Sequence, residues 1–147
     1  MNTLYTKMIE YYSGDPKRIQ HFTKVHSYAR LIGQLEHLSD DTQNILEIAA
    51  LVHDIGIKIS ELKYGNCNGK NQEKEGKAEA EKLLTELGYP QEVIERVSYL
   101  VGHHHSYDQI EGMDYQILVE ADFIVNMYED AESEENCRKV CKRIFSD

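Results

Sequence analysis

A histidine and an aspartate stand side by side in the stretch LVHDIG, residues 51–56, at the end of the mostly apolar run ILEIAALV, residues 45–52. An imidazole and a carboxylate that enter an apolar core cost free energy unless they find partners. Both groups are ligands for divalent transition-metal ions, so a shared cation is one arrangement that would satisfy them. His53 and Asp54 are therefore the first candidates for chemistry in this chain.

Three more polar side chains are predicted to lie on apolar helix faces. Residues three and four positions apart are neighbours on a helix, and at these positions His26, His104 and Asp122 have mainly apolar residues. Separate unpaired groups would together cost several kcal/mol, against a total stability of about 5–15 kcal/mol. One divalent cation would satisfy them together, whereas hydrogen-bonded core groups without a metal are the alternative interpretation.

The elements that must position these residues are all predicted to be helices. Asp15 and Pro16 are typical of an N-cap and a first helical position, and the apolar pattern that follows predicts a helix up to Leu35. A second helix, capped within residues 40–42, runs into LVHDIG, where Gly56 ends or bends it. Further helices are predicted over 73–87, from Tyr89–Pro90 through His103–His105, over 115–130, and from Ser133 onward.

Two segments between these helices lack helical signals. The glycine- and asparagine-rich stretch 63–72 is predicted to be a loop, and residues 109–114 a turn. No alternating pattern of convincing strand length occurs, and no internal repeat. The sequence therefore predicts an all-α fold, a single compact domain over residues 1–147 with about six main helices.

Composition narrows the function classes. The chain has 147 residues with 26 acidic and 16 basic side chains, a net charge of −10, which argues against a binder of duplex nucleic acid. No stretch of about 18 apolar residues occurs, so no membrane span is predicted. The first residues do not resemble a secretory signal. The odd set Cys67, Cys137 and Cys141 has no framework spacing, which indicates a reducing cytoplasm.

This pattern resembles the HD domain superfamily of metal-dependent phosphohydrolases. Its members carry a histidine on one helix, a His-Asp pair at the end of another, often one or two further histidines, and an aspartate on a later helix. The segments that match, over roughly residues 20–130, are KVHSYAR at His26, ALVHDIGIK at His53 and Asp54, LVGHHHSYD at His103–His105 and LVEADFIV at Asp122.

The resemblance implies an all-α domain around a divalent metal ion, with His26, His53, Asp54 and Asp122 as ligands. It implies iron, manganese or another transition metal, or magnesium, and attack on a phosphate ester by a metal-bound water. Asp54 could also orient or deprotonate that water.

One departure from the family pattern bears on the number of metals. Members with two metals have a histidine in the helix after the loop, where this chain reads QEKEGKAEAEKLL, residues 72–84. Glu73 or Glu75 could replace that histidine, with His104 as a further candidate of a second site, or both glutamates could be ordinary first-turn acids. We expect one metal rather than two.

Phosphate binding needs cations besides the metal, and Lys58, four residues after Asp54, is the first candidate. With Asp54 and His104 it completes the predicted catalytic residues. The expected partner is a small phosphorylated substrate, a nucleotide or a related metabolite, and a homodimer is left open. The main alternative function is a non-catalytic sensor module that binds a metal or a nucleotide on the same fold. A purely structural helical protein is a third hypothesis.

Overall fold

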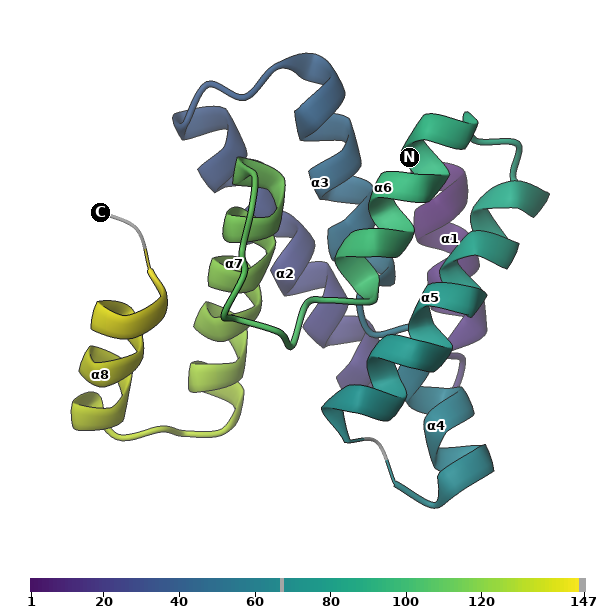
Figure 1. Cartoon of the computed structure of the whole chain (residues 1–147). Coiled ribbons are helices and arrows are strands. Elements are labelled where there is room, and N and C mark those ends of the chain that lie inside the picture. The colour runs from purple at the N-terminus through teal and green to yellow at the C-terminus, as the bar shows by residue number, and fades with distance from the viewer. Residues whose placement is uncertain (67, 146–147) are drawn as a thin grey trace.

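The computed structural model describes residues 1–66 and 68–145, so Cys67 lies outside the described part of the chain. The described residues form eight helices and no strand, which confirms the all-α fold (Figure 1). The helices are α1 (Asn2–Tyr11), α2 (Pro16–Leu35), α3 (Asp40–Val52), α4 (Gly56–Tyr64), α5 (Gly69–Glu86), α6 (Gln91–Val101), α7 (Met113–Glu129) and α8 (Glu134–Ile144).

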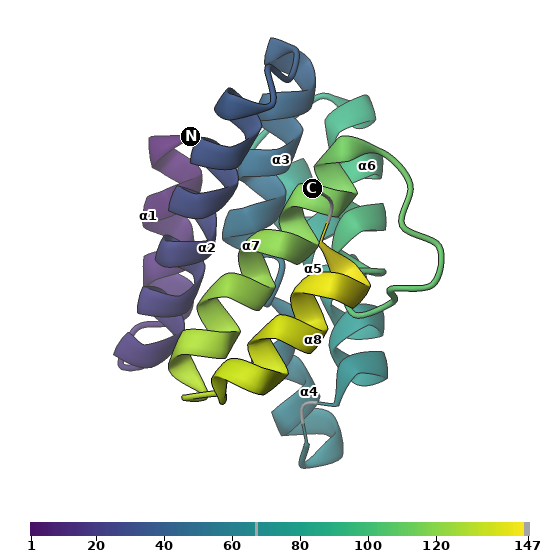
Figure 2. The same ribbon diagram turned by 90° about the vertical axis from the view of Figure 1, so that its left-hand side faces the viewer.

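The helix α3 is the centre of the packing, because it contacts α1, α2, α6 and α7. Figure 2 shows α2 and α7 side by side in front of α3, and these two helices also pack on each other. Every residue of its second half, from Leu46 to Val52, belongs to the buried apolar core except Glu47. The chain therefore leaves α3 with His53 and Asp54 in the middle of the molecule.

Several helix starts follow the predicted capping chemistry. Asp15 accepts a hydrogen bond from the backbone of Arg18 at 3.3 Å, with Pro16 as the first helical residue, and Ser133 accepts one from the backbone of Asn136 at 3.2 Å. The start of α3 differs from the prediction, because Ser39 is the N-cap rather than a residue within 40–42.

Two predictions about where helices begin and end are wrong. The stretch 63–72 is mostly helical, since α4 continues to Tyr64 and α5 begins at Gly69. Asn68 caps α5 by accepting a hydrogen bond from the backbone of Asn71 at 2.9 Å, so these asparagines start a helix instead of forming a loop. The three histidines 103–105, in contrast, lie in a turn after α6 has ended at Val101.

The helix α1 is additional to the predicted ones. Leu4 and Met8 are buried on one face of α1 and Tyr12 directly follows it, so a spacing of four residues marks the side that packs on α3. No helix in the described part of the chain is long and apolar enough to cross a membrane.

Gly56 begins α4 instead of ending α3. A Cβ atom at this position would lie 2.3 Å from the backbone oxygen of Gln72 and 2.5 Å from the backbone nitrogen of Gly76. Real Cβ atoms do not approach backbone so closely, so only glycine allows α4 and α5 to pack here. This contact places the start of α5 next to the His53–Asp54 turn.

Candidate metal centre

Side chains from three parts of the fold converge at the end of α3. The Nε2 atom of His21, on α2, lies 3.1 Å from Asp54 Oδ2 and 3.1 Å from Asp122 Oδ1, the latter on α7. His53 Nε2 lies 3.3 Å from each of the same two carboxylate oxygens. The two imidazole Nε2 atoms are 3.2 Å apart, so two nitrogens and two oxygens surround one point.

A further histidine approaches the same carboxylate from the other side. His104 is 1% exposed, and its Nε2 atom lies 3.5 Å from Asp54 Oδ1. That nitrogen is buried and has no hydrogen-bond partner among the described residues. Asp54 therefore lies between His21 and His53 on one side and His104 on the other.

The outer nitrogens of these histidines are all occupied. His53 Nδ1 donates to the backbone oxygen of Ala50 at 2.7 Å, and His104 Nδ1 donates to that of Val101 at 2.7 Å. These carbonyls can only accept, so the proton sits on Nδ1, and the Nε2 atoms of His53 and His104 are directed at the cluster as ligands.

His21 has the same arrangement with a charged partner. Its Nδ1 atom lies 2.5 Å from Oε1 of Glu129, in the last turn of α7. A carboxylate behind a histidine fixes the orientation of the ring and raises its strength as a ligand, as is typical of metal sites. The donor set, the tautomers and the unpartnered His104 nitrogen therefore fit a divalent transition-metal ion.

The buried carboxylates of the cluster favour positive charge beside them. Burial lowers the pKa of His21, but its hydrogen bonds to Asp122 and Asp54 outweigh burial and raise that pKa to about 10. Burial likewise opposes the charged form of His53, while the charges of Asp54 and Asp122 hold its pKa well above its ordinary value. Burial would raise the pKa of Asp54, yet His53 lowers it well below the ordinary value. Protons or a divalent cation can meet this demand, so the two compete.

The described residues contain two groups of side chains whose donor atoms lie within 4.8 Å of one another: His21, His53 and Asp54, and Asp54, His104 and His105. Asp54 belongs to both. His105 Nε2 also lies 2.9 Å from Oε1 of Gln72, and burial, followed by the charge of His104, lowers the pKa of His105 to about 4. His105 is therefore neutral and available as a ligand near pH 7.

The structure does not bring His26 to this cluster, contrary to the prediction. Its Nε2 atom lies 3.3 Å from Glu47 Oε1, and the edge of its ring contacts Tyr5. His21 and His26 are five positions apart, which is about 140° around the helix axis. Because α2 packs on both α3 and α7, both histidines are buried. An apolar face in the sequence therefore does not distinguish which of the two reaches the centre.

The two glutamates proposed for a second site are engaged elsewhere. Glu75 accepts hydrogen bonds from the Tyr64 hydroxyl at 2.8 Å and from Lys63 at 3.1 Å, which lower its pKa. Glu73 accepts one from Ser106 at 3.1 Å. Neither belongs to a group of donor atoms that could hold a metal in the described residues. Gln72, in the first turn of α5, is the residue that contacts the histidine turn.

Lys58 does not lie with the clustered residues. Its Nζ atom donates to the backbone oxygen of Tyr11 at 3.2 Å and lies 4.9 Å from the centre of the Tyr11 ring. The side chain is thus engaged at the end of α1, and the structure gives it no contact with His53, Asp54 or His104.

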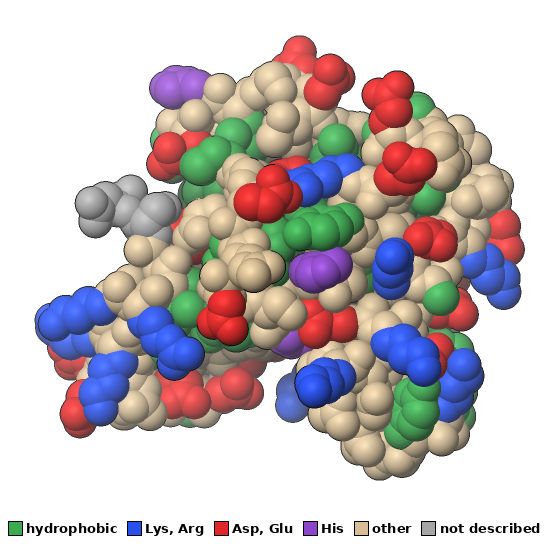
Figure 3. All heavy atoms as spheres, viewed as in Figure 1, with side chains coloured by type: hydrophobic (Ala, Val, Ile, Leu, Met, Phe, Trp, Pro, Cys, Tyr) green, Lys and Arg blue, Asp and Glu red, His purple; other side chains and the backbone are tan. Residues whose placement is uncertain are grey.

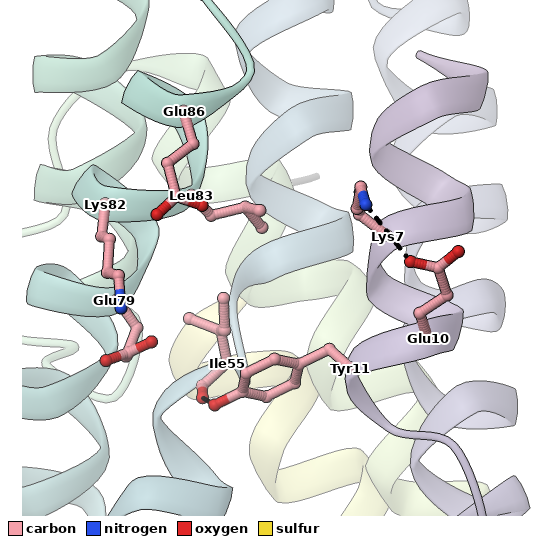
Figure 4. A pocket seen from close by; sticks show the side chains of 8 residues that line it. All are labelled: Lys7, Glu10, Tyr11, Ile55, Glu79, Lys82, Leu83 and Glu86. Atoms are coloured by element: carbon pink, nitrogen blue, oxygen red, sulfur yellow. Dashed lines mark hydrogen bonds and ion pairs between the residues drawn. The ribbon is translucent and has the colours of Figure 1, made fainter.

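Two tyrosines that no sequence motif singled out, Tyr11 and Tyr12, hold the turn after α3. The Tyr12 hydroxyl donates to the backbone oxygen of Asp54, and that of Tyr11 to the backbone oxygen of Ile55 at 3.2 Å. Figure 4 shows Tyr11 reaching from α1 to Ile55 across a groove of about 380 Å³ between α1 and α5. This groove is larger than any hollow at His21, but none of the clustered histidines or aspartates lines it.

Figure 3 shows a histidine side chain near the middle of this face, with hydrophobic side chains above it, a basic one to its right and acidic ones below it. His103 and His105 are both partly exposed. The turn after α6 therefore connects the buried cluster with solvent.

Comparison with known proteins gives a family and a fold. The sequence profile of the HD domain family matches residues 18–145. No curated protein sequence matches the chain significantly. A solved structure from an uncultured Thermotogales bacterium, described as a predicted HD superfamily hydrolase, superposes with a TM-score of 0.66 at 22% sequence identity. The alignment covers 98% of this chain and 84% of the other, which shows a shared fold.

Proposed function

Because this chain belongs to the HD domain family, we propose that it is a metal-dependent phosphohydrolase of small phosphate esters, such as a nucleotide or a related metabolite. The observation that carries this proposal is that the Nε2 atoms of His21 and His53 each lie 3.1–3.3 Å from one oxygen of Asp54 and one of Asp122. His104, with its unpartnered nitrogen, extends this set.

The proposed ligands of the first cation are His21, His53, Asp54 and Asp122. A divalent cation bound there would lower the pKa of its bound water and offset charge on the phosphoryl oxygens. Iron and manganese, like other transition metals, suit a mixed set of imidazole and carboxylate ligands. One cation rather than two remains our prediction, and Asp54, His104 and His105 are the candidates if a second one binds.

The protein side chains have separate tasks in this mechanism. Asp54 Oδ2 faces His21 and His53, while Asp54 Oδ1 faces His104, so one carboxylate can bind at one oxygen and accept a proton from the attacking water at the other. Glu129 and the carbonyl of Ala50 hold the imidazoles in place. The net charge of −10 favours a small substrate over a nucleic-acid polymer.

The test begins with the metal content of untagged protein purified without chelator, beside a folded His53→Ala/Asp54→Ala variant. We expect about one or two equivalents of a transition metal in the wild type and none in the variant. A panel of phosphate esters is then assayed with manganese, iron and magnesium. Metal binding without turnover of any ester would favour the sensor module, and absence of metal after reconstitution would contradict both.

A further inference from the structure

A small hollow of about 120 Å³ reaches two members of the metal centre, His21 and Asp54. Its walls come from the first turn of α2 and the end of α7, with the lining residues Lys17, Arg18, Asn126, Glu129 and Asp130. It has room for several water molecules. A phosphoryl group suits this polar hollow, and the rest of a substrate would extend out of it.

Two cations of this hollow lie on the helix face that carries His21. Lys17 and Arg18 precede His21 by four and three positions, which places all three on the same side of α2. The Arg18 side chain is 32% exposed, and its one ion pair among the described residues is with Glu61 at 3.6 Å. Lys17 makes no hydrogen bond or ion pair within the described part of the chain, so both cations can bind an anion.

The acidic residues of the hollow are largely committed. Glu129 is bonded to His21 Nδ1, and Asp54 belongs to the metal centre. Asp130, at the end of α7, is the remaining carboxylate among the lining residues. Arg18 in turn holds only a 3.6 Å pair with the exposed Glu61, so Arg18 and Lys17 are the groups of this hollow that can bind an anion beside the proposed metal.

We infer that Arg18, with Lys17 beside it, binds the terminal phosphoryl group of a phosphate monoester in this hollow. The inference rests on the proposed function and names the substrate class. A monoester has three non-bridging oxygens, so two can pair with the guanidinium fork while the third points toward the metal centre. A diester has only two such oxygens, so it cannot pair two with the guanidinium fork and still direct a third to the metal centre.

The kinetic test compares p-nitrophenyl phosphate with bis(p-nitrophenyl) phosphate on manganese-loaded enzyme. We expect the monoester to be preferred, and Arg18→Ala to raise its KM by roughly ten- to hundred-fold, because charge-assisted hydrogen bonds are lost. Arg18→Lys should recover part of the loss, since it keeps the charge without the fork. Equal or better turnover of the diester would overturn the inference.

A binding measurement separates this inference from the proposed hydrolysis. Inorganic phosphate is titrated into manganese-loaded wild type, Arg18→Ala and Lys24→Ala by calorimetry. Lys24 is on the same helix but lies over the Tyr128 ring, 5.5 Å from its centre, so it is a matched control for the loss of one positive charge. Weaker phosphate binding in Arg18→Ala alone supports the inference even if no ester is hydrolysed. Equal binding in all three proteins overturns it even if hydrolysis is found.

Discussion

The hydroxyl of Tyr12 donates a 2.6 Å hydrogen bond to the backbone carbonyl of Asp54. Burial, followed by the charge of Asp54, raises the pKa of Tyr12 well above its ordinary value, so the hydroxyl keeps its proton. Tyr12 follows α1, which precedes the residues matched by the HD domain profile. A residue outside the matched region thus holds the backbone at Asp54, the residue that the histidines of the metal centre share.

The first prediction concerns this bond. Tyr12→Phe removes one of two donors to the Asp54 carbonyl, which also accepts from the Ile57 backbone N–H at 3.0 Å, so we expect the free energy of unfolding to fall by about 0.5–1.5 kcal/mol. Denaturant unfolding of the metal-free protein measures it. Tyr5→Phe is the control, because Tyr5 is on the same helix and its described contacts are ring contacts with Phe22 and His26. Equal losses in the two variants would speak against a specific role of the Tyr12 hydroxyl.

The second prediction compares the two buried histidines of α2. We expect His21→Ala to weaken metal binding by more than the roughly 10–100-fold typical of outer-shell changes, because a ligand itself is removed. His26→Ala should keep its metal and activity, and lose about 1–3 kcal/mol of stability because a buried ring that packs beside Glu47 and Tyr5 is removed. Metal content after dialysis and an unfolding curve for each variant provide the measurement. Loss of metal in His26→Ala with retention in His21→Ala would reverse our assignment.

The third prediction tests the residue behind His21. Glu129→Gln removes the charge that orients the ring at 2.5 Å, so metal affinity should fall roughly 10–100-fold while the fold is kept. Competition with a chromogenic chelator reports the affinity. Glu132→Gln is the matched control, since Glu132 accepts a hydrogen bond from Asn136 outside the centre. An unchanged affinity in Glu129→Gln would show that the ring is held by other contacts.

The fourth prediction concerns the close packing of α4 on α5. Gly56→Ala would place a Cβ atom 2.3 Å from a backbone oxygen, so the helices must separate, and we expect a loss of at least about 2 kcal/mol. Gly69→Ala is the control, because its Cβ would make an ordinary 3.4 Å contact with His105. Thermal melts of both variants decide the point, and a Gly56→Ala protein as stable as the control would disprove the steric argument.

Much of the fold was accessible from sequence because it depends on local chemistry. Helical spacing and an N-cap followed by proline predicted the helix over 16–35, which the structure confirms. The apolar run before His53 and Asp54 predicted a core helix that ends at these residues, as α3 does. The prediction of a loop over 63–72 is wrong. Asparagine and glycine are common in loops, but here Asn68 caps the start of α5.

The sequence by itself determined which residue types would gather, since polar side chains on apolar faces had to find partners. Only the tertiary structure decided that His21 rather than His26 reaches Asp54, and that Lys58 lies against Tyr11 while Arg18 lines the hollow. The physical reason is that α2 is covered on two sides, by α3 and by α7. A buried face is visible in the spacing of residues, but which neighbouring helix covers it depends on contacts between residues far apart in the chain.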